Sequence, residues 1–179
     1  MVDLQKSLEA LNLALKTEEE GYELYKAGAE QSKNEFVKSI FQQLFKDERM
    51  HISLIKRFYA ELNQSKTWMQ LSPEEKNYQS IKEKIPTIFS QTLEKVKTGK
   101  ETLSDTDLKV YQKAIEFEKN GVEMYSQFYQ KTTDERAKKF YAFLRDMEQE
   151  HADVLDNTYQ YLKDPNAWYM QKEGWTLED

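Results

Sequence analysis

The sequence contains no cysteine, and its 179 residues include only five glycines and three prolines. The absence of cysteine excludes a disulfide and any thiolate metal site within this chain. Few glycines and prolines, together with no short stretches of alternating polar and apolar residues, argue against a β-rich domain. The composition is that of a helical domain.

Basic residues are not in excess, and no long apolar run is present. The 26 Lys and Arg residues are outnumbered by 32 Asp and Glu residues, which gives a formal net charge of −6, and no basic stripe appears that would bind nucleic acid. The N-terminal segment MVDLQKSLEALNLALK alternates charge with leucine, unlike a signal peptide or a membrane span. We expect a soluble cytoplasmic protein with neither a nucleic acid nor a membrane as partner.

Four long stretches place apolar residues at helical spacing, and the chain length suits one domain over residues 1–179. Ser32 with Glu35, and Ser104 with Asp107, have the spacing of a capping box at the start of the second and third helices. The predicted helices cover residues 3–31, 32–63, 104–131 and 133–163.

Short connections join the predicted helices in pairs, so each pair should form an antiparallel hairpin. The crossover between the pairs is long enough to span the bundle, which lets the second and third helices run in the same direction. It contains a short helical-looking piece at 74–84 and an apolar patch, IPTIF (85–89), that could serve a homodimer or cover the protein's own core. The aromatic tail is expected to fold back as a cap. The expected parts are hairpin one 3–63, crossover 64–103, hairpin two 104–163 and tail 164–179.

The two hairpins carry the same motif 100 positions apart. ALKTEEEGYELY at 14–25 matches AIEFEKNGVEMY at 114–125, and DERMHISLI at 47–55 matches MEQEHADVL at 147–155. No insertion or deletion is needed to keep this register, which indicates a duplicated helical hairpin. The matched ionisable positions that we single out are Glu18, Glu48, His51, Glu118, Glu148 and His151.

These six side chains have the chemistry of a dinuclear metal site. Residues three apart project from one helix face, so Glu48 with His51, and Glu148 with His151, can each bind one ion. The periodicity turns all six toward apolar surface, where four uncompensated carboxylates would be costly or stay protonated. Two divalent cations would balance the four negative charges, and oxygen-rich ligation with one imidazole per ion suits iron or manganese. The alternative is a structural motif copied by duplication, which would not need a place in the core.

One glutamate on each of two helices and Glu-x-x-His on each of two others resembles the dinuclear carboxylate pattern of the ferritin-like bundles. The segments TEEEGYELY, DERMHISLI, EFEKNGVEMY and MEQEHADVL are similar to the rubrerythrin-related branch of that superfamily. The resemblance implies an all-α ferritin-like four-helix bundle that holds two iron ions. It also implies that Glu48 and Glu148 bridge the ions, with Glu18 and Glu118 as terminal carboxylates.

Further side chains are expected around these ligands. Asp47 is placed to accept a hydrogen bond from the outer ring N–H of His151, as metal-bound histidines usually require. The equivalent residue in the second copy is Met147, so the two metal positions are expected to differ. Three tyrosines should face the same interior, where they bond a ligand glutamate, relay an electron or simply fill the core: Tyr22, Tyr25 and Tyr125.

Gly21 and Gly121 mark a departure from the resemblance, because peroxide-reducing rubrerythrins carry an extra carboxylate at the position of Gly121. A glycine inside a helix costs about 1 kcal/mol relative to alanine, so a matched pair indicates a purpose. That purpose is either close helix packing or open space beside the metals. The cysteine-rich electron-transfer domain of the family is also missing from this chain, which implies an external redox protein as electron donor.

We therefore predict a di-iron carboxylate oxidoreductase that reduces hydrogen peroxide or dioxygen with electrons from outside the chain. The alternative is an iron-binding ferroxidase in iron homeostasis with no separate organic substrate. A substrate-oxidising oxygenase and a metal-free helical interaction module are further alternatives, because one bundle supports several chemistries.

Overall fold

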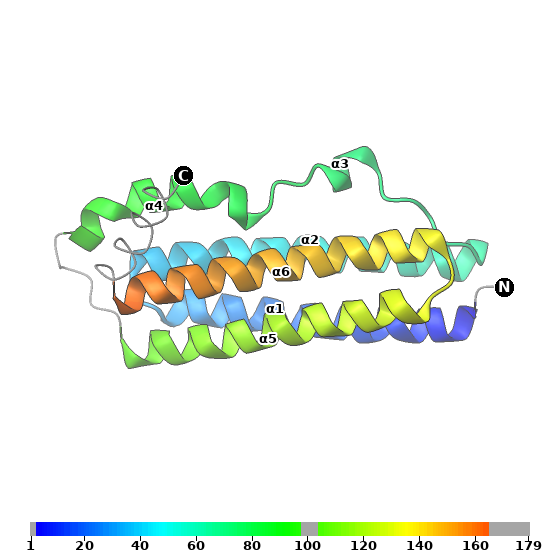
Figure 1. The fold of residues 1–179 in the computed structure, drawn as a ribbon, viewed down its shortest axis with the longest axis horizontal. Coiled ribbons are helices and arrows are strands. Elements are labelled where there is room, and N and C mark those ends of the chain that lie inside the picture. Colours follow the sequence, from blue (N-terminus) through cyan, green and yellow to red (C-terminus); the bar gives the residue numbers. More distant parts are fainter. Residues whose placement is uncertain (1–2, 98–103, 165–179) are drawn as a thin grey trace, which may run out of the picture.

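The computed structural model describes residues 3–97 and 104–164, and within these ranges its regular structure is entirely helical. Four long helices lie side by side, and two shorter ones occupy the crossover (Figure 1). The predicted all-α four-helix bundle is confirmed. The helices are α1 (Leu4–Gln31), α2 (Glu35–Ser65), α3 (Pro73–Lys76), α4 (Ile81–Lys97), α5 (Asp105–Lys131) and α6 (Glu135–Lys163).

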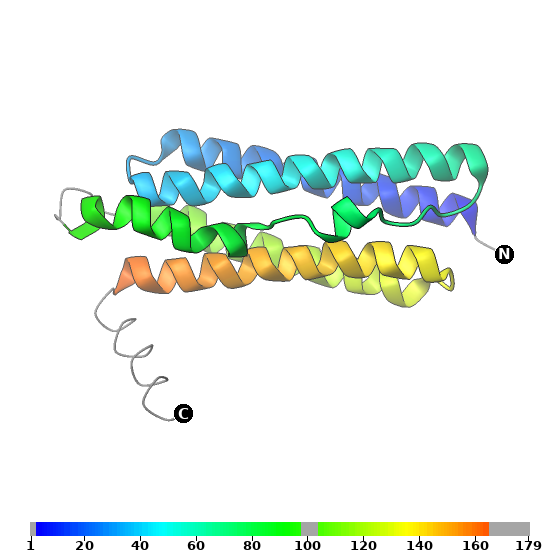
Figure 2. The same ribbon diagram turned by 90° about the horizontal axis from the view of Figure 1, so that it is seen from above.

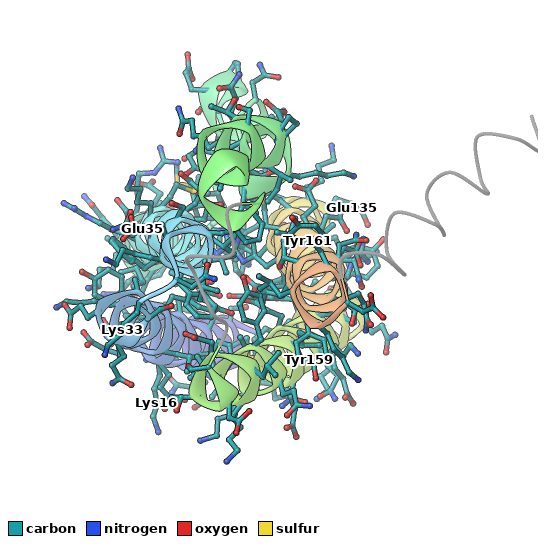
Figure 3. The ribbon with its side chains drawn as sticks, turned by 90° about the vertical axis from the view of Figure 1, so that its left-hand side faces the viewer. Lys16, Lys33, Glu35, Glu135, Tyr159 and Tyr161 are labelled. Atoms are coloured by element: carbon teal, nitrogen blue, oxygen red, sulfur yellow. The ribbon has the colours of Figure 1, made fainter. Side chains whose placement is uncertain are left out.

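The long helices form two antiparallel hairpins, α1 with α2 and α5 with α6. The crossover returns along the bundle, so α2 and α5 run in the same direction, as predicted (Figure 1). On its way it lays α4 against both α2 and α6. Seen from above and from one end, α4 lies over α2 and α6 (Figures 2 and 3). No helix in the described ranges is both long and apolar enough to cross a membrane.

The helix starts agree with the sequence prediction in one case and differ in another. The capping box of Ser104 and Asp107 at the start of α5 is confirmed. The box predicted for Ser32 is wrong, because Ser32 closes α1 by donating its backbone N–H to Gly28. Asn34 caps α2 instead, since its side-chain oxygen accepts two backbone N–H groups of the first turn, each at 3.0 Å.

The single short helix predicted at 74–84 is also wrong, because the crossover forms α3 and α4 with residues 77–80 between them. Pro86 lies in the second turn of α4 and removes one intrahelical hydrogen bond. Packing compensates, since Ile81 is fully buried and Ile85 and Ile88 pack on the core between α2 and α6. The isoleucines of the IPTIF patch therefore cover the chain's own core. The predicted tail, from residue 165 on, lies outside the described residues.

Two apolar clusters fill the two ends of the bundle. One is built around Tyr25, Phe41 and Tyr111, and the other around Phe58 and Phe140, whose rings stack at 4.1 Å. Between the two clusters, each long helix contributes at least one buried ionisable residue. The fold thus places a polar layer at mid-height, closed above and below by hydrophobic packing.

Candidate metal centre

The six ionisable residues of the repeated motif converge in the middle of the bundle. Each long helix contributes at least one of them, and none is more than 2 % exposed. α1 and α5 each provide one glutamate, whereas α2 and α6 each provide a glutamate and a histidine one turn apart. The residues brought together are Glu18, Glu48, His51, Glu118, Glu148 and His151.

The side chains form two overlapping groups, each with one candidate ligand atom per residue and all such atoms within 4.8 Å of one another. Glu48 and Glu148 belong to both groups. Glu18 and His51 complete the first group. Glu118 and His151 complete the second. Two carboxylates shared between two groups would allow both to bridge a pair of neighbouring ions.

Both imidazoles turn the same nitrogen, Nδ1, toward the carboxylates. His51 Nδ1 lies 2.8 Å from Glu18 Oε2 and 3.2 Å from Glu148 Oε1. His151 Nδ1 lies 3.4 Å from Glu48 Oε1 and 3.5 Å from Glu118 Oε1. The two rings stack with their centroids 5.5 Å apart. The site therefore has nearly the two-fold symmetry that the duplicated sequence predicts.

Burial and mutual repulsion disturb the protonation of this cluster. Burial raises the pKa of Glu48 to about 8, and the charges of Glu18 and Glu148 act in the same direction. Burial likewise raises the pKa of Glu148 well above its ordinary range. For His51, burial opposes the charged form, but the charge of Glu18 and the hydrogen bonds to Glu148, Glu18 and Glu48 together outweigh it and raise the pKa well above normal. Without cations, bound protons on Glu48, Glu148 and His51 reduce the negative charge of the cluster.

Several polar atoms of the cluster are buried with no hydrogen-bond partner, including Glu48 Oε1, Glu118 Oε2 and Glu148 Oε1. His151 Nδ1 shares this condition, although it faces the carboxylates. A buried polar group without a hydrogen-bond partner costs about 1–3 kcal/mol of stability. A cluster of such groups at one place therefore needs an explanation. Two divalent cations would bind these atoms and balance the four carboxylate charges. The donor set therefore fits a dinuclear site with one imidazole per ion, which suits iron or manganese.

The sequence model of one protein family, Rubrerythrin, matches residues 9–159. The chain belongs to the rubrerythrin family. The match includes both hairpins and all six converging residues of the cluster. No curated protein and no solved structure matches the chain at a significant level. The 179 residues of this rubrerythrin-family chain include no cysteine that could form a rubredoxin-type centre.

Two of the three predicted tyrosines contact the cluster of this rubrerythrin-family chain. Tyr25 donates its hydroxyl to Glu118, and Tyr125 donates to Glu18, so each hydroxyl crosses to the other hairpin. The third, Tyr22, is half-buried, and its ring packs edge-on against Phe45, with centroids 5.8 Å apart. The repeat held a signal that separates them, since Tyr25 and Tyr125 are matched 100 positions apart and Tyr22 is matched by valine.

The paired glycines provide close packing rather than open space. A Cβ atom at Gly121 would lie 3.3 Å from both Cγ and Oε2 of Glu148. A Cβ atom at Gly21 would lie 3.3 Å from Cδ of Glu48 and only 2.9 Å from the ring of Phe117. Each glycine therefore makes room for one of the two glutamates that both ligand groups share: Gly21 for Glu48 and Gly121 for Glu148.

Asp47 is fully buried beside His151, with its Oδ2 3.5 Å from the outer ring nitrogen, Nε2. The sequence predicts this proximity but not the three donors that hold the Asp47 carboxylate. Gln43 and the Tyr78 hydroxyl each donate to Oδ1 at 2.8 Å, and the backbone N–H of Ile81 donates to Oδ2 at 3.0 Å. Two of these donors come from the crossover, which no periodic pattern connects with the site.

Proposed function

We propose that the cluster holds two iron ions and that the chain is a di-iron oxidoreductase that reduces hydrogen peroxide or dioxygen. The observation that carries the proposal is the convergence of four carboxylates and two imidazoles in a buried layer. Glu48 and Glu148 would bridge the ions, and Glu18 and Glu118 would be terminal carboxylates. His51 and His151 complete the ligand set, with one imidazole for each ion. Manganese satisfies the same donor set.

When bound in the ferrous state, the ions would supply two electrons for the reduction of one peroxide to two waters, a reaction that also consumes two protons. The protein's own groups prepare the site for this. Tyr25 and Tyr125 fix the terminal glutamates by hydrogen bonds, and the two apolar clusters exclude bulk water from the layer. Low local polarity strengthens the interaction between cations and carboxylates.

We propose that replacement electrons come from outside these 179 residues, which contain no cysteine for an iron–sulfur or rubredoxin-type relay. We propose an external redox protein as the donor and the cytoplasm as the place of action, with no role for nucleic acid or membrane.

The same absence supports a second candidate function. If no electron relay serves the site, ferrous ions themselves would be the reductant, and the chain would then act as a ferroxidase in iron handling. The two functions differ in turnover. A peroxidase with a chemical reductant consumes many equivalents of peroxide per chain, whereas a ferroxidase consumes ferrous ion in proportion to the oxidant.

Stopped-flow absorbance of the ferrous-loaded protein mixed with peroxide or dioxygen tests the proposal. We expect iron oxidation to be faster than that of free ferrous ion, and repeated turnover when a reductant is added. A His51→Ala, His151→Ala double variant should lose the acceleration, whereas the exposed-surface variant Glu23→Gln should keep it. Oxidation no faster than that of free ferrous ion would overturn both functions.

A further inference from the structure

The two halves of the metal centre share their candidate ligands but not their surroundings. Asp47 stands beside the ligand set in the first copy of the motif, and its equivalent is Met147. Gln43, which donates to Asp47, has Phe143 as its equivalent. The crossover adds to this difference, because Tyr78 and the backbone of Ile81 both donate to Asp47. The symmetry of the duplicated hairpin is thus broken outside the ligands.

On the His151 side, the outer nitrogen of the ring faces a carboxylate that cannot rotate freely. Asp47 receives hydrogen bonds on both of its oxygens, from Gln43, Tyr78 and the backbone of Ile81. Ile81 is itself fully buried in the apolar cluster, so the backbone donor is fixed by packing. Tyr78 is half-buried, with the Lys84 ammonium 5.5 Å from its ring centroid.

On the His51 side, the outer nitrogen of the ring has no corresponding partner. His51 Nε2 and His151 Nε2 are both buried without a hydrogen bond of ordinary geometry, but among the described residues only His151 Nε2 is paired with a carboxylate, Asp47 Oδ2 at 3.5 Å. The residue equivalent to Asp47 is Met147, which is buried and whose thioether is only a weak acceptor. The two imidazoles therefore differ in how firmly their orientation and tautomer are fixed.

A carboxylate that accepts the outer N–H of a metal-bound histidine keeps the inner nitrogen free for the metal and makes it more basic. Loss of such a partner typically lowers metal affinity about 10- to 100-fold. We propose that Asp47, held by the crossover residues Tyr78 and Ile81, is a positioning residue that makes the His151 side the tighter metal position, which fills first. This inference rests on the proposed dinuclear site. The crossover is then part of the metal centre as well as a connection between hairpins.

Anaerobic calorimetric titration with Co²⁺ alone, followed in parallel by its visible absorption, tests the order of filling. We expect two binding steps separated by about 10- to 100-fold in affinity. His151→Ala should remove the tighter step, and His51→Ala the weaker one. Two equal steps, or the reverse assignment, would overturn the inference and leave the dinuclear site intact, whereas no Co²⁺ binding would contradict the proposed function itself.

Two further variants test the role of the crossover. Asp47→Asn should weaken the tighter step about 10- to 100-fold, change the absorption of the first bound Co²⁺ and leave the weaker step unchanged. Tyr78→Phe, which touches none of the ligands, should shift the same step in the same direction by a smaller factor. Tyr59→Phe, at a half-buried tyrosine of the other apolar cluster, is the matched control. Equal weakening of both steps in either test variant would refute a positioning role on one side.

Discussion

Replacement of Glu48 by glutamine should stabilise the metal-free protein and abolish the proposed dinuclear metal site. The Glu48 side chain is buried at the centre of the layer, where burial raises its pKa from an ordinary value of 4.5 to about 8. Between these two pH values the folded chain holds a proton that the unfolded chain releases. Its stability must therefore fall as the pH rises through this window. Glutamine keeps the shape of the side chain and carries no proton to lose.

The size of the effect follows from the pKa shift. Each pH unit between 4.5 and 8 is worth about 1.4 kcal/mol, so the penalty reaches about 3 kcal/mol at pH 7 and about 5 kcal/mol above pH 8. Urea unfolding in the presence of a chelator, followed by circular dichroism at pH 5, 6, 7 and 8, measures it. The stability advantage of Glu48→Gln over the natural chain should grow steadily with pH.

Glu23→Gln provides the matched control, because Glu23 lies on the exposed face of α1. Its stability relative to the natural chain should hardly change over the same pH range. An advantage of Glu48→Gln that stays constant or shrinks with rising pH would refute the reasoning, since it would mean that Glu48 is ionised in the metal-free fold.

Three further outcomes are expected. Metal binding should release protons and tighten as the pH rises from 6 to 8, because the raised pKa values of Glu48, Glu148 and His51 leave protons that a cation must displace. A calorimetric titration in buffers of different ionisation enthalpy measures the proton release, and a metal affinity independent of pH would contradict the prediction. Gly121→Ala should weaken metal binding, because the new Cβ lies 3.3 Å from the Glu148 carboxylate. The same change should stabilise the metal-free fold by up to about 1 kcal/mol through helix propensity, and an unchanged metal affinity would count against the packing argument. Ferrous or manganous ion at about 100 times its dissociation constant should stabilise the fold by about 2.7 kcal/mol per site, seen as a rise in the thermal midpoint that Glu48→Gln lacks.

The sequence repeat alone predicts the positions that form the polar layer. An offset of 100 residues, with no gap, pairs Glu48 with Glu148 and His51 with His151, and helical periodicity turns all of them inward. These inferences need only spacing and the cost of buried charge. The same repeat also separates Tyr25 and Tyr125, which reach the cluster, from Tyr22, which does not.

Features that depend on the crossover could not be predicted in this way. Ile81, Ile85 and Ile88 have helical spacing and pack α4 against the core. Pro86 lies among them, and a proline is normally a sign that a helix does not continue, so the pattern did not predict α4. The contact of Tyr78 with Asp47 joins residues from unrelated parts of the pattern and depends on where the crossover lies. Such a contact is set by tertiary packing, which leaves no local signal in the sequence.

The iron content of the anaerobically loaded protein tests the central claim most directly. After dialysis against ferrous ion and removal of the unbound excess, elemental analysis should find two ions per natural chain. A folded variant with both shared carboxylates replaced, Glu48→Gln with Glu148→Gln, should hold none at the same ferrous concentration. Failure of the natural chain to retain iron, or an equal iron content in the double variant, would contradict the account.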